Sequence, residues 1–113
     1  MAFGINNYAL SGRLTRDPEL RKTPSGTSVC DIGICYNERV KNAAGEWEDK
    51  PHFFTAVAWA GLAEAVARDL KKGDQVTLAG SLTYDSWESP EGEKRSQVKL
   101  RVEDVVYENP REA

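Results

Sequence analysis

One stretch, residues 52–76, limits the possible folds most strongly, because its hydrophobic period changes twice. His52–Ala60 alternates between two faces, as a β-strand does. In Leu62–Leu70 the large apolar residues recur four apart instead, which predicts an amphipathic helix. Gly73 stands where a helix commonly ends, and Gln75–Leu82 alternates again. The stretch therefore predicts a strand, a helix and a return strand.

The first of these strands has two unequal faces. One face carries larger side chains, namely Phe53, Thr55, Val57 and Trp59. The other carries one ring and three small residues, namely Phe54, Ala56, Ala58 and Ala60. We predict that the alanine face fits a tight interior and that the other face presents rings. A core position beneath the helix is the alternative for Trp59, since tryptophan is often largely buried.

The remaining elements are predicted on either side of this stretch. Further strands are predicted at Asn7–Leu14, Thr27–Asn37 and Gln97–Tyr107, with loops at Thr15–Gly26 and Glu38–Pro51. Thr83–Ser96 is predicted to be an extended hairpin with its turn at Ser89–Gly92. Gly33, in the middle of its strand, predicts a bulge or bend. Leu82 and Val98 are predicted to point inward.

Five strands with one helix between the third and fourth are the order of the OB-fold, a partly open Greek-key barrel. We therefore predict an all-β domain with one helix over residues 1–107, followed by a short charged tail at 108–113. OB-folds hold oligonucleotides or oligosaccharides on one face and in the loops after their first and fourth strands. The corresponding loops here, Thr15–Gly26 and Tyr84–Arg95, both carry cations.

The net charge, the two cysteines and the single histidine limit the classes of function to consider. The net charge of −3 counts mildly against a nucleic-acid binder, although local basic patches can bind what the average repels. Cys30 and Cys35 lie an odd number of residues apart, which puts them on opposite faces of one strand. Two unpaired thiols without a signal peptide fit a reducing cytoplasm. Neither the cysteine spacing nor the single histidine predicts a metal site, and no cofactor or enzyme motif is recognisable.

Several multi-residue motifs follow one another along the chain: Gly12–Arg21, Thr23–Gly26, Val57–Trp59, Leu62–Glu64, Leu70–Gly73, Gly80–Leu82, and Ser86-Trp87 before Glu91-Gly92. In this order they resemble the motifs of the bacterial single-stranded DNA-binding proteins, the SSB family. The resemblance runs from about Asn7 to Tyr107. It implies an OB-fold subunit of a homotetramer that binds single strands with little sequence preference. Such proteins act in DNA replication, recombination and repair and are not enzymes.

The resemblance also implies site residues. Trp59, Phe53 and Trp87 match stacking positions of the family, and Lys71 and Lys72 match a basic pair after the helix. From the residues alone, the further nucleic-acid-binding candidates are Arg13, Thr55, Lys99, Arg101, Arg95, Tyr84 and Trp47. For most there is a plainer alternative: a subunit contact for Phe53, a solvated charge for Arg13, Lys99 and Arg101, and a loop staple for Trp47. Tyr36 is expected in the core or at a strand end, because it shares parity with Ile32 and Ile34, and His52 is expected to be structural.

The sequence also departs from the family pattern. A further tryptophan position of some members is Val40 here, and basic residues flanking the hairpin tryptophan are Thr83 and Asp85. We therefore expect weaker binding per subunit or a shifted footprint. The sequence stops at Pro110–Ala113, without the acidic tip through which bacterial members recruit other enzymes. This suggests either a trimmed chain or a short phage, plasmid or paralogous form, and it puts tail-mediated recruitment in question.

The leading prediction is a sequence-tolerant single-stranded DNA-binding protein. The second is a protein-interaction OB module, such as a replication-restart accessory, whose outward aromatics form an interface. An oligosaccharide-binding barrel ranks third, because cations around the rings suit phosphate better than sugar.

Overall fold

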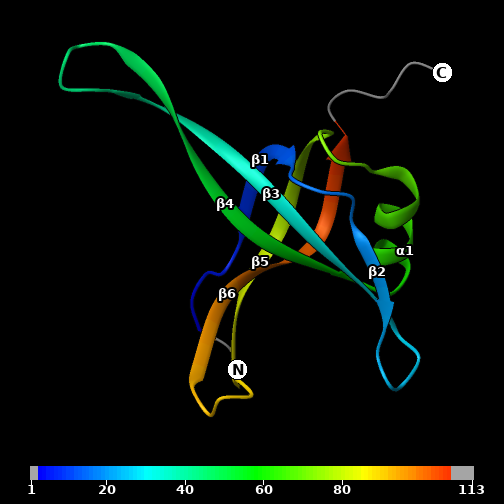
Figure 1. Ribbon diagram of the computed structural model, residues 1–113. Helices are drawn as coiled ribbons and strands as arrows, with labels where there is room; N and C mark the ends of the chain where they lie inside the picture. Colours follow the sequence, from blue (N-terminus) through cyan, green and yellow to red (C-terminus); the bar gives the residue numbers. More distant parts are fainter. Residues whose placement is uncertain (1–2, 108–113) are drawn as a thin grey trace.

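The computed structural model describes residues 3–107, which form six strands and one helix (Figure 1). The elements are β1 (Tyr8–Leu14), β2 (Glu19–Lys22), β3 (Ser28–Lys41), β4 (Trp47–Trp59), α1 (Ala60–Asp69), β5 (Gln75–Glu88) and β6 (Lys94–Tyr107). The predicted tail at 108–113 lies outside the described residues.

The strands form one sheet in the order β1-β5-β6-β4-β3-β2, and a pairing of β1 with β3 closes it into a barrel. The closure is short, since only Arg13 and Leu14 of β1 pair with β3. β4 and β6 run parallel where Ala56 pairs with Leu100, and all other strand pairs are antiparallel. Five strands thus make the barrel, with α1 between the third and fourth of them, as predicted.

The core follows from the alternation of each strand. Ala56 and Ala58 of β4 are fully buried, which confirms the tight interior for these two residues, whereas Phe54 and Ala60 of the same predicted face are exposed. The rest of the core cluster comes from the other barrel strands and from α1, and includes Ile32, Ile34, Val66, Val76, Leu78, Leu100 and Val102. Cys30 also belongs to it, and burial raises the pKa of its thiol to about 11.

Gly80 allows β5 and β6 to approach each other closely. A Cβ added to Gly80 would collide with the backbone carbonyl of Arg101 on β6. The register of β5 and β6 shifts beside this residue, between Ala79 and Gly80. The side chain is therefore excluded by a neighbouring backbone, which cannot easily move.

The helix begins and ends close to the predicted positions. The residue before it, Trp59, has an extended backbone and makes no capping hydrogen bond through its side chain. Glu64 ties the helix to the barrel, because its carboxylate accepts a 2.8 Å hydrogen bond from the buried hydroxyl of Ser28. Gly73, at φ 91°, occupies the left-handed region in the turn that follows.

Two predicted loops were wrong. Thr15–Gly26 contains the short strand β2, which pairs with β3. Most of Glu38–Pro51 belongs to β3 and β4, whose pairing continues out to Lys41 and Trp47. These strand ends project from the barrel as a two-stranded arm (Figure 1). Because both faces of the arm meet solvent, most of its residues are polar, and Val40 and Trp47 are too isolated to give the alternation by which strands are recognised.

Three further expectations also need correction. Gly33 is not at a bulge, because it pairs in regular register with Thr55. Leu82 and Val98 have the predicted inward parity but are exposed, since β5 and β6 outrun the closed part of the barrel. Tyr36 is exposed in the middle of β3, with its ring 6.2 Å from that of His52.

Candidate nucleic-acid interface

The outer faces of β4, β6 and β5 lie side by side and carry many of the predicted residues. Val57 on β4 stands opposite Arg101 on β6, which in turn stands opposite Ser81 on β5. Further along β6 and β5, Lys99 stands opposite Thr83. Since side chains alternate, residues 53, 55, 57 and 59 share this outer surface with 99 and 101. We call it the β4–β6 face.

Aromatic rings on the β4–β6 face are open to solvent. Phe53 is 70% exposed and Trp59 is 42% exposed. The core alternative for Trp59 is therefore wrong: it precedes the helix at the barrel surface and is not beneath it. The ring borders a hollow of about 290 Å³ lined by Val57, Trp59, Thr83, Asp85 and Arg101. An aromatic surface beside a cation offers both stacking and phosphate contact to a nucleotide.

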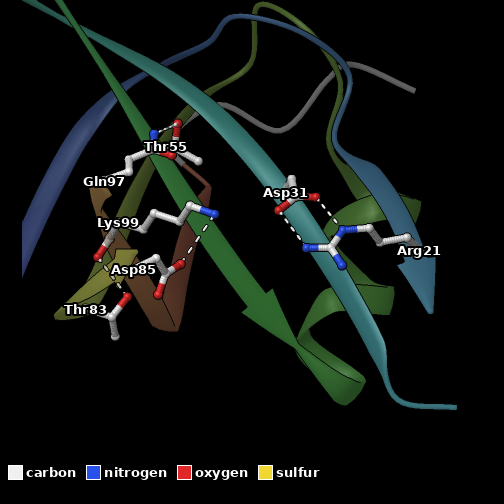
Figure 2. A network of polar contacts seen from close by, with 7 residues as sticks. All are labelled: Arg21, Asp31, Thr55, Thr83, Asp85, Gln97 and Lys99. Carbon is white, nitrogen blue, oxygen red and sulfur yellow. Dashed lines mark hydrogen bonds and ion pairs between the residues drawn. The ribbon is translucent and has the colours of Figure 1, made fainter. Parts of the chain in front are cut away.

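Polar contacts hold the middle of the face in a defined arrangement (Figure 2). Gln97 on β6 donates a 3.0 Å hydrogen bond to the hydroxyl of Thr55 on β4. Lys99 lies 3.5 Å from a carboxylate oxygen of Asp85 on β5. Thr83 donates to the backbone carbonyl of Lys99 at 3.5 Å. These contacts tie three strands together and place Thr55 and Lys99 on one surface.

The second tryptophan of the predicted site lies further out on the β5–β6 hairpin. Trp87 is 48% exposed, pairs with Arg95, and has the same parity as Thr83 and Asp85. Arg95 forms an ion pair with Glu93 at 2.9 Å. Tyr84 has the opposite parity and stands opposite Val98, so the structure places it on the other side of the hairpin from Trp87.

Other predicted residues are elsewhere. Trp47 begins β4 at the tip of the β3–β4 arm, where Lys41 lies 5.9 Å from its ring centroid. Twelve residues of extended strand separate it from Trp59, or about 40 Å. Arg13 donates to the carbonyl of Gly73, in the turn after α1 that also contains Lys71 and Lys72. These three cations form a separate group beside β1.

Sequence reasoning missed Arg16. A Cβ added to Gly33 would lie 2.7 Å from Nη1 of Arg16 and closer still to the hydroxyl of Thr15. Gly33 therefore leaves room for these two side chains over β3, next to Thr55. Among residues 3–107, Arg16 has no hydrogen-bonding or ion-pairing partner. The signal was the glycine inside a strand, which marks a close approach as well as a bulge.

Arg21 is held differently. Its guanidinium contacts both carboxylate oxygens of Asp31, at 2.7 and 3.4 Å, and joins β2 to β3 (Figure 2). The hydrogen bond and the charge of Asp31 raise the pKa of Arg21 further. This pair stabilises the edge strand β2, and the Arg21 guanidinium is already occupied by Asp31.

Metal-binding groups and membrane-spanning helices would indicate other classes of function. Within residues 3–107, no three His, Cys, Asp or Glu side chains gather as a group that could hold a metal ion. No helix in the same range is long and apolar enough to cross a membrane.

The sequence of this chain is similar to those of known proteins. The matching family is described as "Single-strand binding protein family", over residues 5–107. A single-stranded DNA-binding protein of Thermus thermophilus is 46% identical over 106 residues, covering 94% of this chain and 38% of that protein. One from Borreliella burgdorferi is 45% identical over 102 residues, covering 89% of this chain and 68% of that protein. The chain thus spans well under half the length of the Thermus relative.

A solved structure confirms the fold. The chain of a "Plasmodium falciparum SSB complex with ssDNA" superposes with a TM-score of 0.85. The match covers 96% of this chain and 99% of that one, at 18% sequence identity. The predicted OB-fold barrel is therefore correct.

Proposed function

Because the chain belongs to the single-strand binding protein family, we propose that it binds single-stranded DNA with little dependence on sequence. Bases would stack on exposed rings, and lysine and arginine side chains would contact phosphates. A family of DNA-binding proteins also agrees with the prediction that the chain is not an enzyme.

The observation that carries the proposal is the position of Trp59. Its ring is exposed on the β4–β6 face, beside Arg101 and in line with Thr55 and Phe53. Every base has a flat π-face, so stacking on such rings tolerates any sequence. Trp87, Phe53 and the cations Lys99, Arg101 and Arg95 are proposed to extend this surface. Tyr84, Trp47 and the group of Arg13, Lys71 and Lys72 are proposed as outlying contacts of a longer strand.

Intrinsic tryptophan fluorescence tests the proposal. We expect oligo-dT to quench the emission to saturation, because bases stack on Trp59 and Trp87. The affinity should fall as salt rises, since bound cations release counterions from the strand. Duplex DNA of equal length is the control, because its bases are already stacked. A folded protein that shows no quenching at low salt would contradict the stacking site.

We also propose that the chain assembles with copies of itself into a tetramer. Along Tyr8–Gly12, the edge of β1 away from β5 has no partner strand within residues 3–107. Nearby, an apolar groove of about 450 Å³ is lined mainly by Tyr8, Leu10, Phe54, Leu82, Val98 and Leu100. Open strand edges and apolar patches are surfaces on which subunits pair. Sedimentation equilibrium should give a mass of four chains, and a monomer at micromolar concentration would contradict this.

The proposed setting is DNA replication, recombination and repair in the cytoplasm or at the nucleoid. The free cysteines Cys30 and Cys35 suit a reducing compartment. The second candidate, a protein-interaction module, is favoured by the apolar groove and the net charge of −3. It requires the rings of Trp59 and Trp87 to be covered by a protein partner, in which case DNA would not quench them.

A further inference from the structure

The β4–β6 face contains a carboxylate where a bound strand needs positive charge. Asp85 lies on β5, lines the hollow beside Trp59 and Arg101, and pairs with Lys99 at 3.5 Å. Figure 2 shows the two side chains pointing toward one another across the face. A phosphate that follows a base stacked on Trp59 would meet this carboxylate.

The ion pair is weak enough to exchange. It consists of one contact, and the Asp85 side chain is 50% exposed, so solvent screens the attraction. The Arg21–Asp31 pair differs, since it has two contacts and joins an edge strand to the barrel. Lys99 is 21% exposed, which indicates that its stem is packed and its ammonium group stays on the face.

We propose that Asp85 is an internal competitor of DNA: it occupies Lys99 in the free protein and must be displaced before Lys99 can contact a phosphate. This inference rests on the proposed function. It assigns Asp85 a role in limiting affinity and Lys99 a phosphate contact that is available only after exchange. The protein would bind single strands less tightly, and release them more readily, than its exposed rings alone allow.

The test is a set of four proteins: the unaltered chain, D85N, K99M and the double variant. Each is titrated with oligo-dT at several salt concentrations. We expect D85N to bind about threefold to tenfold more tightly at low salt, since one unit charge close to the phosphates is removed. The logarithmic salt slope should steepen by about 0.7, the value of one added phosphate contact.

The double variant shows whether Asp85 acts through Lys99. If it does, the gain from D85N largely disappears in the K99M background. Methionine keeps the packed stem of Lys99, so the fold is retained. An equal gain in both backgrounds would mean simple long-range repulsion and would overturn the exchange.

D104N is the matched control. Asp104 on β6 is an exposed carboxylate opposite Ala79. Ala79 lies six residues from Asp85 along β5, or about 20 Å away. The affinity of D104N should change less than twofold, and a gain equal to that of D85N would overturn the inference. Thermal unfolding of D85N should match the unaltered chain within a few degrees, because exposed ion pairs contribute little.

Four further outcomes are informative. A gain of equal size with oligo-dA, oligo-dC and oligo-dT supports a phosphate contact. Weaker binding of D85N to oligo-dA and oligo-dC alone would mean that Asp85 accepts hydrogen bonds from base amino groups, which overturns the proposal. If the unaltered chain binds single strands and D85N binds equally well, only this inference fails. If the unaltered chain does not bind, the proposed function fails with it.

Discussion

Replacing Trp59 by leucine isolates stacking from packing. Trp59 is 42% exposed, so more than half of the residue is packed against the barrel. A tryptophan buries up to about 250 Å², so up to roughly 145 Å² is at stake, or about 4 kcal/mol of stability. Alanine would lose most of that contribution and confuse the result. Leucine retains much of the apolar contact but has no ring.

We expect Trp59→Leu to weaken binding of oligo-dT by about 1–3 kcal/mol, the range for one stacked base. This corresponds to a loss of about fivefold to 150-fold in affinity. Trp59→Phe should fall between leucine and the unaltered chain, because it keeps a smaller ring. No helix cap is lost, since the Trp59 side chain makes no capping hydrogen bond.

Fluorescence anisotropy of labelled oligo-dT measures these affinities without depending on the tryptophans. Tyr36→Ala is the control: Tyr36 is 44% exposed, nearly the same fraction as Trp59, but it pairs with His52 and so lies on the opposite sheet face. The affinity of this variant should stay within about twofold of the unaltered chain. If Trp59→Leu binds as tightly as the unaltered chain while unfolding at a similar temperature, Trp59 is not a stacking platform.

Three other changes test particular parts of the structure. Arg16→Ala should weaken binding and flatten the logarithmic salt slope by about 0.7, since the free guanidinium over Gly33 is one potential phosphate contact; an unchanged slope would exclude it. Gly80→Ala should lower the free energy of unfolding by about 1–3 kcal/mol in urea titration, because its Cβ meets a backbone carbonyl; unaltered stability would refute the close approach of β5 and β6. At pH 8, iodoacetamide should label Cys35 but not Cys30 by mass spectrometry, because burial raises the pKa of Cys30 to about 11 and keeps its thiol protonated; equal labelling in the folded chain would contradict this.

Strand parity was the most informative sequence signal. The alternation of residues 52–60 correctly predicted that Ala56 and Ala58 face inward and that Phe53 and Trp59 face outward. The switch from period two to period four correctly located the helix, because helices and strands repeat differently along the chain. These are local properties, and adjacent residues are sufficient to determine them.

The extent of the strands could not be predicted in the same way. The arm formed by the ends of β3 and β4 is wet on both faces, so its pairing is visible only in three dimensions. The same holds for Arg16, whose position over Gly33 depends on the loop after β1 folding back across β3. Ion pairs such as Lys99–Asp85 likewise join residues that are distant in sequence.

The long hairpins provide the physical argument for the proposed assembly of this chain with further copies of itself. Inside the barrel, inward parity means burial, as for Leu78 and Leu100. Further along the same strands, inward parity continues past the barrel end, and Phe54, Leu82 and Val98 become an exposed apolar surface. The strands cannot be extended without exposing one apolar face, unless that face is covered. A second copy is the cover we propose, and it would leave the opposite face, with Trp59 and Arg101, free for DNA.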